Sequence, residues 1–448
     1  MTFDELLSKI RSGEIDTVQV AAPDMLGRLV GKRYTGEFFA RELLEGTTHG
    51  CSYLFAVNID MEPQDGYRLA NWDLGFGDFE MRPDFNAVFA IPWETSSALV
   101  FCDFHQHDGA PVEQAPRRIL QRQLERLSAL GMKANAASEL EFFMFNEDYA
   151  AAARSGYAAL TPSSTYRIDY HMLQPARDEA IFREIRNQML LAGIPIENSK
   201  GEWGVGQHEI NITYADPLTM ADRHVVFKQG TKHIAQLHGK SITFMAKPAR
   251  GEAGSSCHLH MSLFRERGNA FWDETAHAGS PLFRQFLGGL MKYSRELSLF
   301  FAPTINSYKR FEAMSWAPTK QVWATDNRTT GFRVVGHGQS FRVENRMPGA
   351  DANPYLAFAA MLAAGLAGIE ENLDCGGEYS GNAYVDAALP ALPTNLREAV
   401  DLFESSAVAT GSFGADVVEH YVHAAKLEIR DFDGAVTDWE RKRYFERI

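Results

Sequence analysis

The chain contains 448 residues, of which 45% are hydrophobic and 23% are charged, and its net charge is −14. This length excludes a small single domain, and the composition is that of an ordinary soluble globular protein with a large buried core. No run of Lys and Arg residues could follow a phosphate backbone, so nucleic acid is not expected as a partner.

The first 106 residues are predicted to form a small, mainly β domain. Residues 2–12 have helical spacing of apolar side chains, while TVQVAAP (17–23) and ALVFCDF (98–104) are typical of strands. The segment between these two strands, rich in Gly, Asp and aromatic residues, is expected to form a turn at DMLGR and then loops. About 100 residues is a typical size for one domain.

Residues 107–448 are predicted to form a second domain in which strands alternate with helices. A clear helix is expected within residues 111–131, with Pro116 near its start and apolar residues on one side. Further helices are expected around residues 178–193, 219–238 and 281–300, and through much of 394–448. Strands are expected at SELEFFMF (138–145), GQHEINITY (206–214), SITFMAK (241–247), HLHMSLF (258–264) and FRVENR (341–346).

The longest apolar run and the cysteines indicate where in the cell the protein is expected. Residues 356–369 form the longest apolar run, which is too short to span a bilayer and predicts a buried helix, so no membrane partner is expected. The cysteines are scattered without zinc-site spacing and no signal peptide is visible, so reduced thiols in a cytoplasm are expected. They are Cys51, Cys102, Cys257 and Cys375.

Charged side chains recur inside β-forming sequence at four places. Any one such strand is typical of a half-solvated sheet, but four in one chain indicate a sheet with one face lining a polar cavity. The segments are SELEFF with Glu139 and Glu141, KGEWGVGQHEI with Glu202 and Glu209, SSCHLHMS with His258 and His260, and FRVENR with Arg342, Glu344 and Arg346.

Convergence of these segments would gather five glutamates and one histidine. Buried carboxylates in that number cannot stay ionised without counter-charge, because repulsion and desolvation raise their pKa values. Oxygen-rich ligands with one imidazole suit Mg²⁺ or Mn²⁺ rather than zinc, and two cations fit such a set. Neighbouring arginines indicate phosphate or carboxylate recognition, so the predicted chemistry is phosphoryl transfer from a metal-bound nucleotide. The chain has no GxxxxGK[ST] loop.

A set of motifs spread over essentially the whole chain resembles the glutamine synthetase family. In chain order they are SELEFFMF, GEWGVGQHEINI, TFMAKP, AGSSCHLHMSL, APTINSYKRF, DNRTTGFRV, RVENRMPGADANPYLAFAAMLAAGL and VTDWERKRY. The resemblance implies an α+β fold, with an N-terminal β-grasp domain (1–106) and a C-terminal catalytic domain (107–448) built on a curved antiparallel sheet flanked by helices.

The resemblance also implies an enzyme that uses ATP and two or more Mg²⁺ or Mn²⁺ ions per site. ATP phosphorylates the γ-carboxylate of L-glutamate, and an amine then displaces the phosphate. A homo-oligomer is implied, a dodecamer of two hexameric rings in which neighbouring subunits share each active site.

Particular residues match the functional positions of the family. A first metal ion is expected on Glu141, Glu202 and Glu209, and a second on Glu139, His258 and Glu344. Substrate glutamate is expected at Gly254, Arg310 and Arg346, and the transferring phosphoryl group at Arg328. ATP is expected near Glu197, His260, Ser262, Arg333 and Arg342.

Some residues in these motifs also have a purely structural explanation. His260 is equally consistent with a hydrogen-bonded core histidine, and Arg333 with an ordinary surface ion pair. Trp203 is consistent with either core packing or substrate contact. Lys247 is expected to support structure, and Cys257 to be a small buried residue.

One departure from the family pattern concerns the amine. Glutamine synthetases that use ammonia carry a Glu six residues beyond the Arg of NSYKR, and Trp316 stands at that position here. An Asp in an FDGSS-like stretch is also missing from the corresponding HGCSYLF (49–55). Ammonium is small and strongly hydrated, and its capture calls for carboxylates, whereas a Trp face suits the carbon part of an organic amine.

The sequence therefore predicts a glutamate–amine ligase that makes a γ-glutamylamide, with a role in amine catabolism. The candidate amines are aniline-type amines, alkylamines, ethanolamine and polyamines, and Trp316 favours a less charged one. A polyamine would need further carboxylates, for which Glu62 and Asp65 are candidates although a solvated loop is the simpler reading. Glu202 is the candidate base for the incoming ammonium group.

Two alternatives stay open. The first is an ammonia-using glutamine synthetase in which Glu312 replaces the missing flap Glu. The second is a non-catalytic relative, which should have lost metal ligands, whereas every ligand position here holds a competent residue.

Overall fold

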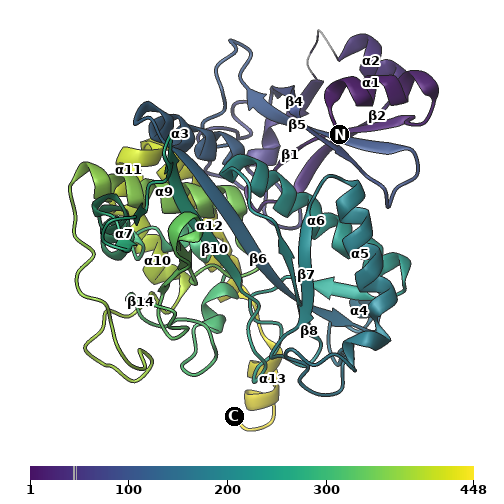
Figure 1. Cartoon of the computed structure of the whole chain (residues 1–448). Helices are drawn as coiled ribbons and strands as arrows, with labels where there is room; N and C mark the ends of the chain where they lie inside the picture. Colours follow the sequence, from purple (N-terminus) through teal and green to yellow (C-terminus); the bar gives the residue numbers. More distant parts are fainter. Residues whose placement is uncertain (44–45, 47) are drawn as a thin grey trace.

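A computed structural model describes residues 1–43, 46 and 48–448. Two β-sheets organise the chain. Figure 1 shows the smaller sheet near the N-terminus at one end of the molecule, and the larger sheet, with β6 and β10 side by side, through its middle. The predicted α+β class, with curved sheets flanked by helices, is confirmed.

The smaller sheet has strand order β2-β1-β5-β4-β3, and only the β1–β5 pair is parallel. Its strands are β1 (Thr17–Pro23), β2 (Leu29–Thr35), β3 (Thr48–Cys51), β4 (Asp78–Ala90) and β5 (Ser97–His105). Helices α1 (Phe3–Ser12) and α2 (Gly36–Glu42) pack on it, and their buried Leu6 and Phe39 join its apolar core. Thr2 and Glu5 form a capping box that fixes the start of α1.

The expectation of loops between β1 and β5 was wrong. That segment contains β2, α2, β3, the 3₁₀ helix η1 (Ser52–Phe55) and β4. The pairing of β4 with β5 shifts register between Pro83 and Val88, and this irregularity interrupts the alternation that would otherwise mark a strand in the sequence.

The larger sheet has the order β14-β15-β16-β10-β6-β8-β7, with β11 beside β10 and β9 beside β6. All of its pairs are antiparallel except β14–β15. Its strands are β6 (Lys133–Phe145), β7 (Ile196–Gly201), β8 (Gln207–Ile212), β9 (Ser241–Thr243), β10 (Cys257–Arg265), β11 (Gly268–Asn269), β14 (Trp323–Thr325), β15 (Phe332–Val335) and β16 (Arg342–Asn345). A separate hairpin pairs β12 (Trp272–Asp273) with β13 (Ala278–Gly279).

Helices cover the apolar face of the larger sheet. Helices α3 (Pro116–Ala129) and α6 (Pro217–Leu237) pack on β6, and α9 (Pro354–Glu370) packs on α3, α6 and α7 (Pro281–Tyr293). Nearly every side chain of α9 is buried, which confirms the predicted buried helix. Burial of its apolar surface is the main force that holds these layers together.

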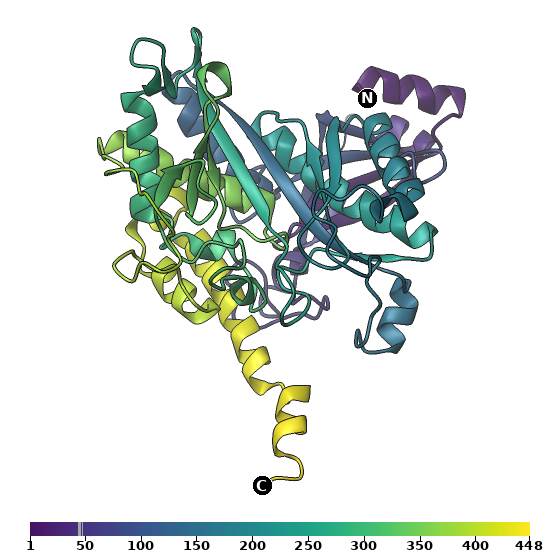
Figure 2. The same cartoon turned by 60° about the horizontal axis from the view of Figure 1, so that its bottom comes forward.

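The remaining helices surround this core. They are α4 (Tyr149–Arg154), η2 (Pro175–Arg177), α5 (Glu179–Leu191), α8 (Ser298–Phe301), η3 (Ser307–Arg310), η4 (Gly338–Ser340), α10 (Leu396–Glu404), α11 (Ala407–Phe413), α12 (Ala415–Gly434) and α13 (Asp438–Tyr444). Figure 2 shows α12 and α13 extending away from the body toward the C-terminus. Among the described residues, no helix combines the length and the apolarity needed to cross a membrane.

A buried arginine joins the smaller sheet to two helices that pack on the larger sheet. Arg117 on α3 donates to both oxygens of Asp222 on α6, at 3.1 and 3.0 Å. The same guanidinium reaches Asp103 on β5 at 2.8 Å and Asp84 on β4 at 2.7 Å. The Tyr355 hydroxyl donates to Asp222 at 2.6 Å. The predicted domain boundary between residues 106 and 107 falls between β5 and α3, and it remains a prediction.

Candidate active site

The first group of carboxylates is formed by Glu141, Glu202 and Glu209. Glu141 on β6 lies directly opposite Glu209 on β8, and cross-strand partners share one face of a sheet. Glu202 was expected in β-forming sequence, but it follows the end of β7 in the turn before β8. One carboxylate oxygen from each residue lies within 4.8 Å of the others, so the structure brings the three together.

Burial and like charge make this group difficult to ionise. Burial, followed by repulsion from Glu202, raises the pKa of Glu141 to about 7. Burial with repulsion from neighbouring carboxylates also raises the pKa of Glu202 and that of Glu209 to about 7. Lys200, opposite Glu209 on β7, forms an ion pair with Glu202 and supplies part of the missing positive charge.

Hydrogen bonds fix the position of the Glu141 carboxylate. The Ser256 amide and hydroxyl donate to it at 2.8 and 2.6 Å, and the Gln207 side-chain amide donates at 2.9 Å. Donors that hold a carboxylate in one orientation also prepare it to bind a cation.

The second group comprises Glu139, Glu344 and two histidines of β10. Strand register places His258 opposite Glu139, and His260 opposite Glu344. His258 Nδ1 lies 3.3 Å from Glu139 and 3.4 Å from Glu344, while His260 Nε2 lies 2.9 Å from Glu139. Glu139, His260 and Glu344 present ligand atoms within 4.8 Å of one another, so both imidazoles border the group. The assignment of His258 as the ligand remains a prediction.

Arg346 and the neighbouring imidazoles favour the ionised form of the carboxylates in this second group. Burial alone would raise the pKa of Glu344, but Arg346 and the two histidines hold it at about 2. Burial would likewise raise the pKa of Glu139, and its contacts with His258 and His260 instead hold it well below its usual range. Burial, followed by the charge of Arg346, lowers the pKa of His258 to about 4, so its imidazole is neutral and able to bind a metal ion.

Both groups fit hard divalent cations. The donors are carboxylate oxygens with imidazole nitrogens, a set that favours Mg²⁺ or Mn²⁺ over zinc. His258 Nε2 is buried and has no hydrogen-bond partner among the described residues, as a nitrogen that serves an ion would be. In the first group Lys200 forms an ion pair with Glu202, and its single charge cannot balance three carboxylates. A divalent ion would supply the remaining charge that ionisation requires.

A cavity of about 720 Å³ lies over these two groups. Its lining contains every predicted metal ligand and every predicted contact to glutamate and the phosphoryl group. The predicted residues it brings together are Glu139, Glu141, Glu202, Glu209, His258, Glu344, Gly254, Arg310, Trp316, Arg328, Arg333 and Arg346. Residues more than 200 positions apart in the chain therefore line one cavity, whereas their roles remain predictions.

The arginines of this cavity are held in different ways. The buried Arg310 donates to the main-chain carbonyls of Met347 at 2.9 Å and Arg346 at 3.0 Å. Gly254 makes room for it, because a Cβ atom at Gly254 would lie 2.5 Å from Arg310 Cγ. The Arg346 side chain donates to Glu344 at 2.6 Å and to the Trp316 carbonyl at 3.3 Å. It therefore links the second group of carboxylates to residues 311–317, the loop with Trp316 that is called the flap below.

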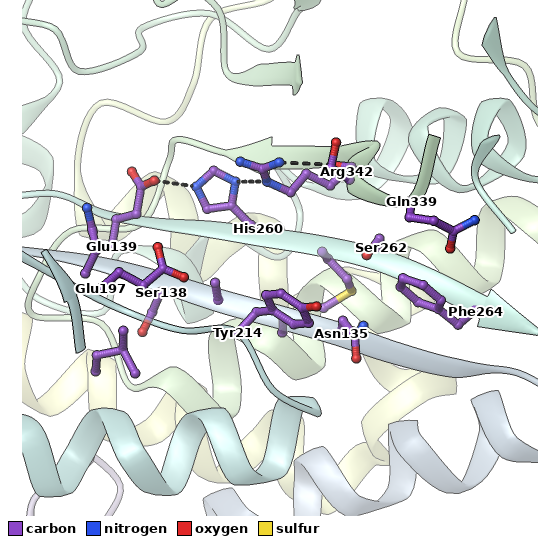
Figure 3. Close-up of a pocket in the computed structure, with 16 residues that line it drawn as sticks. Asn135, Ser138, Glu139, Glu197, Tyr214, His260, Ser262, Phe264, Gln339 and Arg342 are labelled. Atoms are coloured by element: carbon purple, nitrogen blue, oxygen red, sulfur yellow. Dashed lines mark hydrogen bonds and ion pairs between the residues drawn. The ribbon is translucent and has the colours of Figure 1, made fainter. Parts of the chain in front are cut away.

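A second cavity, of about 430 Å³, adjoins the first and shares Glu139 with it. It contains the remaining predicted ATP contacts, Glu197, His260, Ser262 and Arg342. Figure 3 shows Glu139, His260 and Arg342 in one line, and Arg342 Nε lies 3.2 Å from His260 Nδ1. His260 is therefore hydrogen-bonded, as one of its two predictions has it, and its contact with a nucleotide remains a prediction.

Several residues that line the cavities were not predicted from the sequence. Tyr214, Asn135, Phe264 and Gln339 line the second cavity, as Figure 3 shows, and Asp169, Tyr170, Asn198, Lys200 and Asn211 line the first. Alternation could have placed Asn211 on the face of Glu209, two residues earlier on β8. Asp169 and Tyr170 lie in a loop, where no periodic signal exists.

Two tryptophans form an aromatic wall on one side of the first cavity. The rings of Trp203 and Trp316 meet edge to face, with centroids 5.9 Å apart and an interplanar angle of 67°. Trp203 is 38% exposed and Trp316 is 48% exposed, so neither is a core residue. The core-packing prediction for Trp203 is therefore wrong, and Trp203 lines the same cavity as Trp316, whereas its contact with substrate remains a prediction.

The flap that carries Trp316 has a strained backbone. Met314 and Trp316 adopt φ values of +61° and +67°, which non-glycine residues rarely take and which cost about 1–3 kcal/mol each. Such conformations persist only when surrounding contacts impose them. The Ser315 hydroxyl supplies one contact by donating to the Glu312 carbonyl at 2.6 Å.

The carboxylates suggested for other amines lie elsewhere. The Glu312 carboxylate accepts a hydrogen bond from Lys247 Nζ at 2.7 Å and does not line either cavity. Glu62 accepts from the Asn58 side chain at 3.1 Å, and the Asp65 carbonyl contacts His423 on α12 at 2.7 Å. Glu62 and Asp65 are also absent from both cavity linings.

Comparison with known proteins agrees with this geometry. Residues 113–444 match the family model described as glutamine synthetase, catalytic domain. The chain is 48% identical over 447 residues to gamma-glutamylethanolamide synthetase GlnA4 of Streptomyces coelicolor, covering 99% of this chain and 96% of the relative. It is 37% identical over 444 residues to glutamate–isopropylamine ligase of a Pseudomonas species, covering 98% and 97%.

Solved structures give the same result. A structure described as a GmaS/ADP complex superposes with a TM-score of 0.86 at 30% identity, covering 98% of this chain and 99% of that chain. A structure described as apo GmaS without ligand superposes with a TM-score of 0.85 at 31% identity. With the family model matching most of the chain and these relatives matching nearly all of it, the chain belongs to the glutamine synthetase family.

Proposed function

We propose that the protein is a glutamate–amine ligase that joins the γ-carboxylate of L-glutamate to a small organic amine and consumes ATP. The observation that carries the proposal is the aromatic wall of Trp203 and Trp316 at the first cavity. By resemblance to the family, Trp316 takes the sequence position of the Glu that helps ammonia-using enzymes bind ammonium. Two relatives are named for the ethanolamide and isopropylamine reactions, which agrees with an organic amine.

The two carboxylate groups are assigned to phosphoryl transfer. Divalent cations, Mg²⁺ or Mn²⁺, would neutralise both groups and hold the ATP phosphates when bound. Arg328 is exposed in the first cavity and is assigned to the transferring phosphoryl group. Glutamate is assigned to Gly254, Arg310 and Arg346, and nucleotide contacts to Glu197, His260, Ser262, Arg333 and Arg342.

These assignments give a two-step reaction. The γ-carboxylate of glutamate attacks the terminal phosphorus of ATP and forms γ-glutamyl phosphate with release of ADP. The neutral amine then attacks the activated carbonyl, an amide bond forms, and phosphate leaves. Glu202 is assigned as the proton acceptor for the incoming ammonium group, because its carboxylate lies beside the wall and accepts from the Trp203 amide at 3.2 Å.

The charges near the aromatic wall favour an amine with one cationic group. Asp169 and Glu202 line this cavity, and both contact Lys200, at 3.7 Å in the case of Asp169. The distal ammonium of a polyamine would have to compete with Lys200 for these carboxylates. Alkylamines and ethanolamine therefore fit better than polyamines, and an aniline-type ring could pack against Trp316.

A panel of amines tests the proposal. Release of phosphate would be measured with glutamate, ATP and Mg²⁺ or Mn²⁺ against ammonium, isopropylamine, ethanolamine, aniline and spermidine, with the product identified by mass spectrometry. We expect kcat/KM for one of the organic monoamines to exceed that for ammonium and for spermidine. A preference for ammonium would instead identify a glutamine synthetase, and turnover with none of them would point to a non-catalytic relative.

The quaternary structure and location also remain proposals. We expect a homo-oligomer, a dodecamer of two hexameric rings with shared active sites, in the cytoplasm. Light scattering coupled to size-exclusion chromatography would test the subunit number.

A further inference from the structure

Lys247 is a buried cation that ties together two loops at the first cavity. Its side chain is 5% exposed, and its ammonium donates to the Glu252 carbonyl at 2.6 Å and to the Glu312 carboxylate at 2.7 Å. Its own backbone is fixed, because its N–H donates to Asn306 Oδ1 at 2.8 Å and its carbonyl accepts from Asn306 Nδ2 at 2.9 Å. The side chain of this anchored residue thus reaches two segments that lie outside the helices and strands.

These contacts continue to the aromatic wall. The Glu252 side chain accepts from the Val205 amide at 3.2 Å, in the loop that follows Trp203. Glu312 begins the strained stretch that ends at Trp316. Lys247 therefore lies at the centre of a chain of contacts that runs from the Trp203 loop, through Glu252, to the flap with Trp316.

The same contacts keep a carboxylate out of the cavity. Glu312 is 56% exposed and lies four residues before Trp316, and its carboxylate is directed to Lys247 rather than to the cavity lining. A charge-assisted hydrogen bond to a buried ammonium is stronger than an ordinary one, so this orientation is well determined.

We propose that Lys247 is a positioning residue that sets amine selectivity, by holding Trp316 in the aromatic wall and holding the Glu312 carboxylate away from the amine. The inference rests on the proposed function. Lys247 touches neither cavity, so it acts through the two loops and takes no part in the chemistry itself.

The central variant is Lys247→Met, which keeps the length and apolar stem of the side chain but removes the ammonium. Without that ammonium the strained flap loses its charged anchor and keeps only the weaker contacts of Ser315 and of the Trp316 carbonyl and ring. Trp316 is then held less firmly, while Glu312 becomes free to face the amine. We expect KM for the organic amine to rise about tenfold, with kcat and KM for glutamate and ATP changing less than about twofold. The ratio of kcat/KM for ammonium to that for the organic amine should rise about tenfold or more.

A double variant separates the two effects of Lys247. In Lys247→Met/Glu312→Gln the flap is still released, but the freed side chain carries no charge. We expect the gain with ammonium to disappear while the defect with the organic amine remains. Lys247→Arg, which can still donate to Glu312, should recover most of the selectivity. Lys426→Met is the matched control, because Lys426 forms a surface pair with Glu404 at 2.7 Å.

Hydrogen exchange needs no substrate, so it tests the role of Lys247 independently of the proposed function. Hydrogen exchange of the amides of residues 311–317 should accelerate about tenfold in Lys247→Met, measured by mass spectrometry, and stay unchanged in Lys426→Met. If Lys247→Met fails to fold, the same exchange measurement is made on Glu312→Gln, which changes only the exposed partner of Lys247. Exchange of residues 311–317 should be faster in that variant too. Wild-type protein that turns over no amine would overturn the proposed function, whereas the exchange result would still decide whether Lys247 holds the flap.

The inference is overturned by either of two results. One is unaltered exchange of residues 311–317 in both Lys247→Met and Glu312→Gln. The other is an active Lys247→Met enzyme whose amine selectivity equals that of the wild type, or whose KM values for glutamate, ATP and amine all rise together, as general loosening of the site would produce.

Discussion

Trp203 and Trp316 come from loops more than 100 residues apart and meet edge to face, with their ring centroids separated by 5.9 Å. Edge-to-face pairs are favourable beyond the area they bury, so each ring helps to orient the other. Both rings remain partly exposed to the first cavity, which leaves aromatic surface for the carbon skeleton of an amine.

Truncation of the wall should weaken amine binding selectively. In Trp316→Ala we expect KM for the preferred organic amine to rise about ten- to thirtyfold, or about 1.4–2 kcal/mol, because the contact surface is lost. KM for ATP should stay within about twofold, since ATP is assigned to the other cavity. Tyr157→Ala, which removes a 70% exposed aromatic residue outside both cavities, is the control. An equal rise in both KM values would contradict the assigned position of the amine.

The first carboxylate group should make metal-dependent stability vary with pH. The pKa values of Glu141, Glu202 and Glu209 are raised from 4.5 to about 7, so the metal-free native state holds protons that the unfolded chain has lost. The stability contributed by these protons is fully present below pH 4.5 and is lost as pH rises through about 7. Bound Mg²⁺ or Mn²⁺ restores it without protons.

Thermal unfolding measures this effect directly. The increase in Tm between chelator-treated protein and protein with saturating Mg²⁺ or Mn²⁺ should be larger at pH 8 than at pH 6. Metal binding near pH 6 should also release protons, which calorimetry in buffers of different ionisation enthalpy detects. An increase in Tm that is the same at both pH values would show that these carboxylates do not hold the ion.

Removal of one repelling charge should separate stability from activity. Glu209→Gln relieves repulsion with Glu141, so the free energy of unfolding of the metal-free protein at pH 8 should rise by about 1–3 kcal/mol. Turnover should fall about a hundredfold or more because a predicted metal ligand is lost. Urea unfolding and the amine assay measure the two effects, with the exposed Glu404→Gln as control. A less stable metal-free variant would contradict the electrostatic argument.

Gly254 should be intolerant of any side chain. In Gly254→Ala the new Cβ atom would lie 2.5 Å from Arg310 Cγ and 2.7 Å from the Ala246 carbonyl, so Arg310 must shift. We expect KM for glutamate to rise about tenfold or more with little change in KM for ATP. Gly411→Ala in α11 is the control, because nothing lies within 4 Å of the added atom. Steady-state kinetics with unchanged glutamate KM would remove Arg310 from the proposed glutamate site.

The sequence predicted those parts of the site that follow strand periodicity. Glu139 and Glu141 are two residues apart on β6, so their shared face followed directly from the pleat. Cross-strand register then decided which partners they meet, and that register depends on tertiary packing. Motif resemblance supplied what periodicity could not, including Trp316 in the flap, whereas the turn that holds Glu202 was not predicted.

Other features had no local signal. Lys247 and Glu312 are 65 positions apart, and each lies in a segment without regular structure, so neither composition nor spacing could pair them. The long strand β4 was not predicted, because its pairing is irregular after Pro83 and its polar residues there break the alternation expected of a strand. Exposed aromatic residues such as Tyr214 are ordinary in any sequence, and only the folded surface shows which of them border a cavity.

The guanidinium of Arg117 leaves the two sheets little freedom to move against each other. It forms ion pairs with carboxylates from β4, β5 and α6. A rocking motion of the smaller sheet would break some of these pairs and leave buried charges without partners. A joint of this kind opposes closure of the site by movement of the smaller sheet as a whole. We therefore expect short loops such as the flap with Trp316, rather than a moving sheet, to govern entry and exit of substrate.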